Sequence, residues 1–128
     1  NPNFKEDTIK GNYSTWVPGG NSYFVMNGSK YNMTGGFENA DIRSDYNLKD
    51  NEIIMTYKTY NTIFDTNYSE ENINDFIPQD VTFNYCYYYD LNQENVIKTF
   101  NVKIVKLISS GASYIDDNLY YMETQSLK

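Results

Sequence analysis

Histidine is absent from the 128 residues of the chain, and this removes most of the side-chain arrangements that proteins use for catalysis. Ser-His-Asp and Cys-His arrangements need an imidazole as general base, and zinc and iron sites commonly use it as a ligand. Cys86 is the one cysteine, so it lacks both a base and the usual metal-binding partners. We interpret it as a small, half-buried apolar residue within the aromatic run Tyr85-Cys86-Tyr87.

Carboxylates can carry out glycoside hydrolysis without histidine, and three pairs of them are close in sequence. These are Asp41 and Asp45, Glu70 and Glu71, and Asp116 and Asp117. The first pair shares the polar face of a predicted strand, and the second lies in the first turn of a predicted helix, where the dipole favours negative charge. The third precedes a strand, where turns favour Asp. A structural role explains each pair, so we predict that the protein is not an enzyme.

The segment Asp90-x-Asn92-x-Glu94 resembles the start of a calcium loop. Asn95 replaces the glycine of the sixth position, and Asn101 stands where a closing Glu is needed, so a polar hairpin turn is the better interpretation. No glycine-rich loop leads from a strand into a helix, which excludes the common phosphate-binding motifs. We therefore predict neither a metal nor a cofactor.

The net charge of −7 and the single arginine, Arg43, exclude two classes of partner. Nucleic-acid binding needs clustered Lys and Arg to neutralise phosphates, and an anionic membrane surface needs the same. No stretch approaches the roughly 20 apolar residues that span a bilayer. The sequence leaves the oligomeric state open.

Aromatic residues, including 14 tyrosines, are the one feature that could carry a function. Either they fill a core, or they line a cavity for a small apolar or planar ligand. The candidate ligand-binding residues are Tyr46, Tyr57, Phe83, Tyr85, Tyr87, Phe100 and Tyr121. Tyr60, Tyr88 and Tyr120 are expected to face outward, where tyrosines suit stacking on sugar rings or on a protein partner.

Alternation of apolar and polar residues with a period of two predicts strands throughout the chain. The predicted strands cover residues 8–17, 22–26, 30–33, 41–49, 53–57, 81–89, 96–104 and 119–122. Asn27-Gly28 between two apolar runs predicts a tight hairpin, and Asp50-Asn51 predicts a second one. Beyond Ile104 the apolar face switches to Val105 and Leu107, which predicts a bulge within 103–106.

Residues 60–79 break this alternation. The segment 67–70 resembles a helix start with an Asn cap and a carboxylate three residues later. Ile73, Phe76 and Ile77 then follow at helical spacing, and Pro78 ends the run. We expect one short helix over 69–77, placed to cover an open end of a barrel.

The elements together predict a single all-β domain over 1–128. Short connections favour an antiparallel up-and-down meander of about eight strands, because sequence neighbours tend to pair. Such a meander must protect its edges, and closure into a barrel does so. We therefore favour a barrel over a sandwich.

Three segments resemble lipocalin-like domains. Residues 9–13, Ile-Lys-Gly-Asn-Tyr, resemble the Gly-x-Trp start of that family with Tyr13 in the place of Trp, residues 23–31 are similar to its first hairpin, and residues 46–54 resemble its next paired strands. The chain thus resembles the lipocalin-like (calycin-type) small β-barrels of bacterial secreted proteins or lipoproteins. The resemblance implies an extracellular or cell-envelope location, with a signal or lipid anchor upstream.

The favoured hypothesis is a non-enzymatic secreted or cell-envelope domain of lipocalin-like type that binds a small apolar or planar ligand in an aromatic-lined interior. The alternative is a carbohydrate-binding or adhesion module that uses surface tyrosines.

Overall fold

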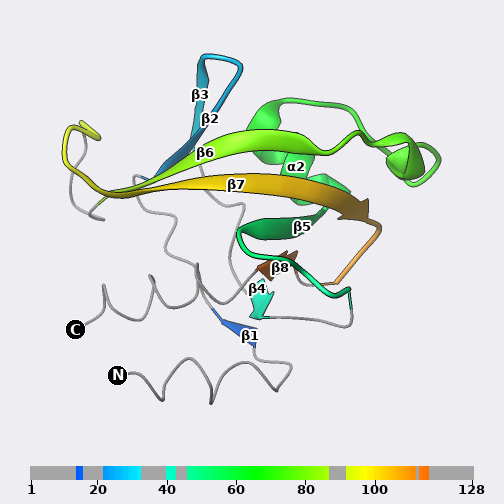
Figure 1. Ribbon diagram of the computed structural model, residues 1–128. Helices are drawn as coiled ribbons and strands as arrows, with labels where there is room; N and C mark the ends of the chain where they lie inside the picture. The colour runs from blue at the N-terminus through cyan, green and yellow to red at the C-terminus, as the bar shows by residue number, and fades with distance from the viewer. Residues whose placement is uncertain are drawn as a thin grey trace.

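The computed structural model of the chain describes residues 14–15, 22–32, 40–42, 46–86, 92–111 and 113–115 (Figure 1). These residues form a mixed eight-stranded sheet, one α-helix and a short 3-10 helix. The sheet order is β1-β4-β8-β5-β7-β6-β2-β3. The strands are β1 (Ser14–Thr15), β2 (Tyr23–Met26), β3 (Ser29–Asn32), β4 (Ala40–Ile42), β5 (Glu52–Thr56), β6 (Gln79–Cys86), β7 (Val96–Ile108) and β8 (Ser113–Ile115).

The sheet is open, so the predicted barrel is wrong. β1 and β3 lie at its two edges, and no pairing joins them within the described residues. The antiparallel meander and its strands fit only in part, because β5 pairs with β7 in parallel and β4 pairs with β8 in parallel. A parallel pair needs a long crossover. The chain makes it by running from β5 through residues 57–78 and β6 before β7 returns beside β5 (Figure 1).

The helix α2 (Tyr57–Phe64) starts directly after β5. Thr56 is its N-cap, and its hydroxyl oxygen accepts a hydrogen bond from the Thr59 N–H at 3.2 Å. Asp65 ends the helix in the left-handed conformation at φ 55°. Tyr60, Ile63 and Phe64 form its buried face, so tertiary packing stabilises a segment of modest helix propensity.

The helix predicted over 69–77 is confirmed only in part, since that segment holds the short 3-10 helix η1 (Ile73–Asp75), while the α-helix lies earlier in the chain. In the sequence, Ile53, Met55 and Tyr57 are spaced two residues apart, as in a strand. This spacing runs up to the residue at which the helix begins, so it does not indicate the helix. The expectation that Tyr60 faces outward is also wrong, because its side chain is 3% exposed.

The Asn27-Gly28 hairpin is confirmed. Both residues have positive φ, 51° and 80°, and Met26 pairs with Ser29 across the turn. The hairpin predicted at Asp50-Asn51 is wrong. Its tight turn is present, since the Glu52 N–H donates to the Lys49 carbonyl at 3.2 Å. β5 pairs with β7 and β8 instead of β4.

Part of the predicted strand 41–49 is also absent. β4 ends at Ile42, residues 43–45 lie outside the described residues, and residues 46–49 are turn and coil. The positive φ of Asn47, 54°, interrupts extended backbone there.

The predicted bulge near Lys103–Lys106 is confirmed. Ile53 pairs with Ile104 and Ile54 with Lys106, so Val105 is the extra residue. The bulge rotates the strand, which lets Ile104 and Leu107 contribute to one core cluster while Val105 and Ile108 belong to another. The strand predicted over 119–122 and all of strand 8–17 except Ser14–Thr15 lie outside the described residues.

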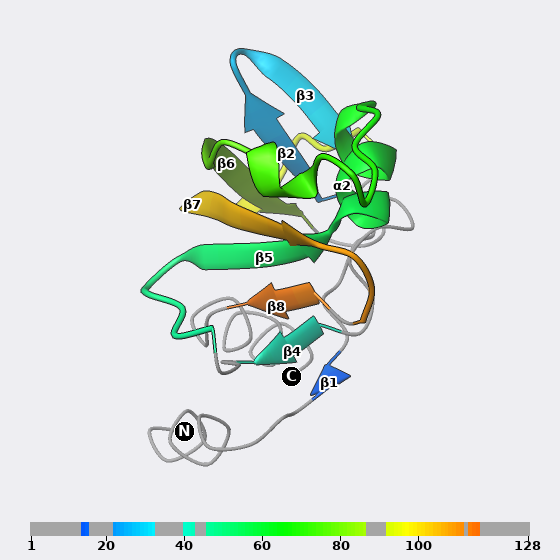
Figure 2. The same ribbon diagram turned by 90° about the vertical axis from the view of Figure 1, so that its right-hand side faces the viewer.

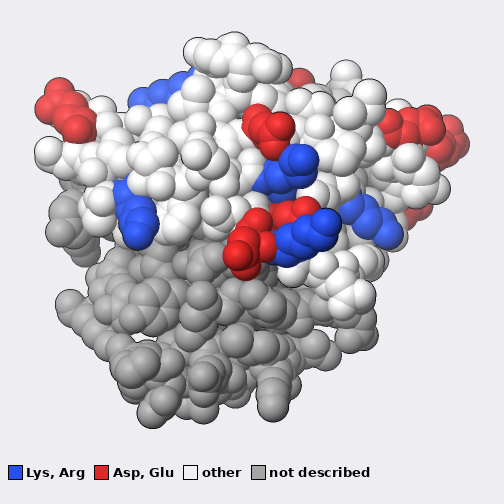
Figure 3. Space-filling model, in the orientation of Figure 1, with Lys and Arg blue, Asp and Glu red and all other residues white. Residues whose placement is uncertain are grey.

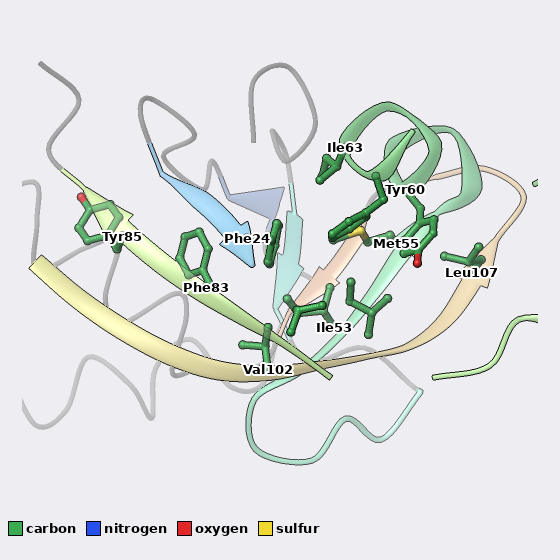
Figure 4. Packing of buried hydrophobic residues seen from close by; sticks show 12 residues of the cluster. Phe24, Ile53, Met55, Tyr60, Ile63, Phe83, Tyr85, Val102 and Leu107 are labelled. Carbon is green, nitrogen blue, oxygen red and sulfur yellow. The ribbon is translucent and has the colours of Figure 1, made fainter. Parts of the chain in front are cut away.

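The main core lies between α2 and one face of the sheet, as Figure 2 shows. Tyr60 and Ile63 of the helix point toward Met55 and Phe24 of the strands (Figure 4). The opposite face of β2, β6 and β7 carries polar side chains, and it is this face that Figures 1 and 3 present to the viewer.

Candidate functional site: a polar groove on the outer face of the sheet

The predicted aromatic site is brought together only in part. Phe83 and Tyr85 are buried in the main core, and Tyr57 and Phe100 pack against it. Tyr46 is separate from this cluster. It is 43% exposed, and its ring packs against the ring of Tyr114 on β8. Tyr87 and Tyr121 lie outside the described residues, as do the outward candidates Tyr88 and Tyr120.

The core aromatics contact one another directly. Ring centroids are 5.3 Å apart for Phe24 and Phe83, 5.5 Å for Phe24 and Phe64, and 4.7 Å for Tyr60 and Phe64. Phe100 continues the series 6.5 Å from Phe83. Tilted rings at these distances are favourable core contacts. The described aromatics therefore favour the interpretation that they fill a core.

Burial raises the pKa of Tyr60 to about 12, and the neighbouring hydroxyls of Tyr68 and Tyr31 add to the effect. The ring of Tyr60 contacts Tyr68 and Phe76 edge-on at 5.7 and 5.1 Å. Asn61 holds the loop that carries Tyr68, because its amide donates to the Tyr68 carbonyl and accepts from the Tyr68 N–H, at 2.8 and 2.9 Å. Tyr60 therefore stays protonated, and its side chain serves core packing.

On the outer face, strand pairing sets polar side chains in rows. One row runs Lys30, Val25, Thr82, Asn101 across β3, β2, β6 and β7. The next row is Asn32, Tyr23, Asn84, Thr99. Because side chains alternate between faces, these residues share the side opposite Phe24 and Phe83.

A groove of about 520 Å³ lies at one end of these rows. Its floor is β6 and β7, and its walls are the two tight turns at Asn27-Gly28 and Asp50-Asn51. It is lined by Val25, Asn27, Gly28, Asp50, Asn51, Asp80, Val81, Thr82, Asn101, Val102 and Lys103. Its lining is divided almost equally between polar surface, from amides, carboxylates, one hydroxyl and one ammonium group, and apolar surface, to which Val25, Val81 and Val102 belong.

The turn at Asp50-Asn51 is fixed in place by backbone bonds. The Lys103 N–H donates to the Asn51 carbonyl at 2.9 Å, which joins the turn to β7. Within the turn, the Lys49 N–H donates to the Glu52 carboxylate at 2.8 Å. The second wall, the Asn27-Gly28 turn, is set by strand pairing of β2 with β3. Both walls are therefore held before any ligand arrives.

An ion pair lies on the floor of the groove, between paired residues of β6 and β7. Lys103 Nζ lies 3.9 Å from Asp80 Oδ1, and these side chains are 48% and 85% exposed. A pair this exposed contributes only about 0–1 kcal/mol, so a ligand can separate the two groups at little cost. Figure 3 shows acidic and basic side chains adjacent to each other in the middle of this face.

Beside the groove, Lys30 Nζ lies 4.4 Å from the centroid of the Tyr23 ring. A cation–π contact at an exposed site is worth about 0.5–1 kcal/mol. Asn84 accepts a hydrogen bond from the Thr99 hydroxyl at 2.7 Å, and Asn32 accepts one from the Gln93 amide at 2.9 Å. Tyr23 thus lies between two oriented amides, its cross-strand neighbours Asn32 and Asn84.

Sequence reasoning did not single out the groove residues. Asp80, Thr82, Asn101 and Lys103 occupy the polar positions of two predicted strands, and the two turns were predicted as turns. The strand order brings these residues together, because β6 is adjacent to β2, and the turn before β5 is adjacent to β7, only in the folded sheet. The sequence does not specify that order.

Among the described residues, no group of three or more His, Cys, Asp or Glu side chains is arranged to hold a metal ion. Of the carboxylate pairs considered from the sequence, Glu70 and Glu71 are exposed, while Asp45, Asp116 and Asp117 lie outside the described residues. In the same part of the chain, no helix is long and apolar enough to span a membrane.

Comparison of the chain with protein-family models, with curated proteins and with solved structures gave no match. The relationship to lipocalin-like domains therefore stays a prediction. The described residues form an open mixed sheet with one α-helix on its core face and a groove on the other.

Proposed function

We propose that this protein is a non-enzymatic binding module that holds a neutral carbohydrate in the groove between the Asn27-Gly28 and Asp50-Asn51 turns. The observation that carries the proposal is the mixed lining of the groove, where amide, hydroxyl, carboxylate and ammonium groups lie beside apolar surface from Val25, Val81 and Val102. This develops the carbohydrate-binding alternative from the sequence, with a different set of residues.

Sugar hydroxyls both donate and accept hydrogen bonds, and so do Asn and Thr side chains. Asn101 and Thr82 are cross-strand neighbours on the floor, beside Val25 on the next strand. Val25 offers an apolar contact to the C–H face of a sugar ring. A small apolar ligand fits this lining less well, because its binding would desolvate polar groups without replacing their hydrogen bonds.

Charge disfavours an anionic ligand. The acidic Asp80 is opposed by Lys103, and the chain as a whole carries −7, which repels anions at long range. Preformed walls reduce the ordering cost of binding. An extracellular or cell-envelope location, as the lipocalin-like resemblance implies, belongs to the same proposal.

The test is calorimetric titration of the full chain with neutral cello-, xylo-, manno- and malto-oligosaccharides. Asn101→Ala and Lys103→Ala should each weaken binding about fivefold to tenfold, the cost of one hydrogen bond of about 1–1.4 kcal/mol. Asn74→Ala and Lys58→Ala are the matched controls, since both residues are exposed on η1 and α2 and away from the groove.

Binding by the wild type that both groove variants weaken, with both controls unchanged, supports the proposal. Binding that is equal in all four variants would place the ligand elsewhere, and no binding across the whole panel would remove the proposal.

A further inference from the structure

Beyond the groove, the rows of outward side chains continue along the same face of the sheet. Tyr23 precedes Val25 by two residues on β2 and points to the same face. At about 3.4 Å per residue, the two side chains lie about 7 Å apart along the strand. A ligand held at Val25 and longer than the groove would reach the Tyr23 ring next.

The surroundings of Tyr23 differ from those of a core tyrosine. It is half-buried, and it has an amide on each side, Asn32 on β3 and Asn84 on β6. Hydrogen bonds from Gln93 and Thr99 orient these two amides. A ring between two oriented amides offers a face for the C–H groups of a sugar and hydrogen-bonding groups for its hydroxyls.

One side chain covers the ring in this structure. Lys30 Nζ lies over Tyr23 at 4.4 Å from the centroid, and Lys30 itself is exposed. Lys30 is also the cross-strand neighbour of Val25, so it lies beside both the groove and the ring. Its long side chain can turn into solvent and uncover the ring.

We infer that Tyr23, with Asn32 and Asn84, forms a second subsite of the same binding face, so that the ligand is an extended neutral oligosaccharide that spans both subsites. This inference rests on the proposed function of the groove. When the oligosaccharide binds, the Lys30 side chain leaves the Tyr23 ring, and a sugar ring stacks on Tyr23 in its place.

The experiment measures affinity against oligosaccharide length, from two to six units, for whichever neutral series of the panel binds the wild type. In the wild type the dissociation constant should fall at least tenfold between the disaccharide and the tetrasaccharide. Tyr23→Ala should abolish this gain while leaving disaccharide binding within about twofold. Tyr23→Phe keeps the ring and should keep the gain, and Lys30→Ala should keep or increase it.

Tyr46→Ala is the matched control, because Tyr46 is exposed and does not belong to the groove or its rows. A measurement on the wild type covers the case in which Tyr23→Ala fails to fold. The ring protons of Tyr23 should shift in NMR spectra on addition of the tetrasaccharide and stay in place with the disaccharide.

The outcomes separate the two proposals. A length gain that survives in Tyr23→Ala, or a Tyr23 ring that does not respond to the tetrasaccharide, would overturn the second subsite and leave the groove proposal intact. If the wild type binds neither the disaccharide nor any longer oligosaccharide, the groove proposal itself is overturned.

Discussion

The backbone N–H of Lys103 donates to the carbonyl of Asn51 at 2.9 Å, and this bond joins a tight turn to a strand more than fifty residues later in the chain. It places Asp50 and Asn51 opposite the Asn27-Gly28 turn. The side chain of the same lysine approaches Asp80 on the next strand. Lys103 therefore contributes to the groove through its backbone and its side chain.

The left-handed conformation of Gly28 should make the first groove wall sensitive to substitution. Gly28→Ala should destabilise the protein by about 1–2 kcal/mol, the cost of placing an L-residue with a Cβ at positive φ. An added Cβ would meet no atom within 4 Å, so backbone strain alone is the cause. Urea denaturation measures the change. Equal stability of variant and wild type would contradict the φ of 80°.

The N-cap of α2 should be worth about 1 kcal/mol. Thr56→Ala removes the oxygen that accepts from the Thr59 N–H, and loss of such a cap typically costs about 0.5–2 kcal/mol. Thr56→Ser keeps the hydroxyl and should recover most of the loss. The exposed Thr62 of the same helix provides the control, and Thr62→Ala should change the free energy of unfolding by less than Thr56→Ala.

Phe64 should be among the most sensitive positions of the core. Its ring contacts Phe24, Tyr31 and Tyr60 at centroid distances of 5.5, 5.1 and 4.7 Å, and its side chain is 4% exposed. Phe64→Ala should cost about 3–5 kcal/mol, enough to unfold many domains. Ile77→Ala is the control, since Ile77 is 71% exposed. Similar melting temperatures for the two variants would contradict the packing of α2 on the sheet.

Tyr60 should make stability fall at high pH. Its pKa is raised from 10.0 to about 12 in the folded state, so between these values the folded chain keeps a proton that the unfolded chain has lost. Stability from this group is complete below pH 10 and decreases as the pH rises toward 12. Because other tyrosines also titrate there, the informative quantity is the difference from Tyr60→Phe. A Tyr60→Phe chain that loses stability as steeply as the wild type over that range would show that Tyr60 titrates normally.

The local features of the fold could be predicted where a few residues determine them. Asn27-Gly28 specifies its turn because both residues tolerate positive φ. The bulge at Val105 follows from the switch of the apolar face after Ile104. Alternation likewise identified the core face of β6, which holds Val81, Phe83 and Tyr85.

Features that depend on distant partners could not be predicted. The Asp50-Asn51 turn was identified, but nothing local shows that the following strand pairs in parallel with β7 instead of with the strand before it. The segment from Tyr57 to Phe64 becomes helical because its apolar side chains meet the sheet. Without the strand order, the groove could not be assembled from residues scattered between Val25 and Lys103.

The most direct test of the account is an NMR titration of the full, isotope-labelled chain with the neutral oligosaccharide panel. We predict that amide signals shift at residues 27–28, 50–51, 80–82 and 101–103, around the groove, while signals of α2 stay in place. Two results would contradict a carbohydrate-binding groove on the outer face of the sheet: signal shifts confined to α2 and to the strand residues that face the main core, or no shift with any oligosaccharide.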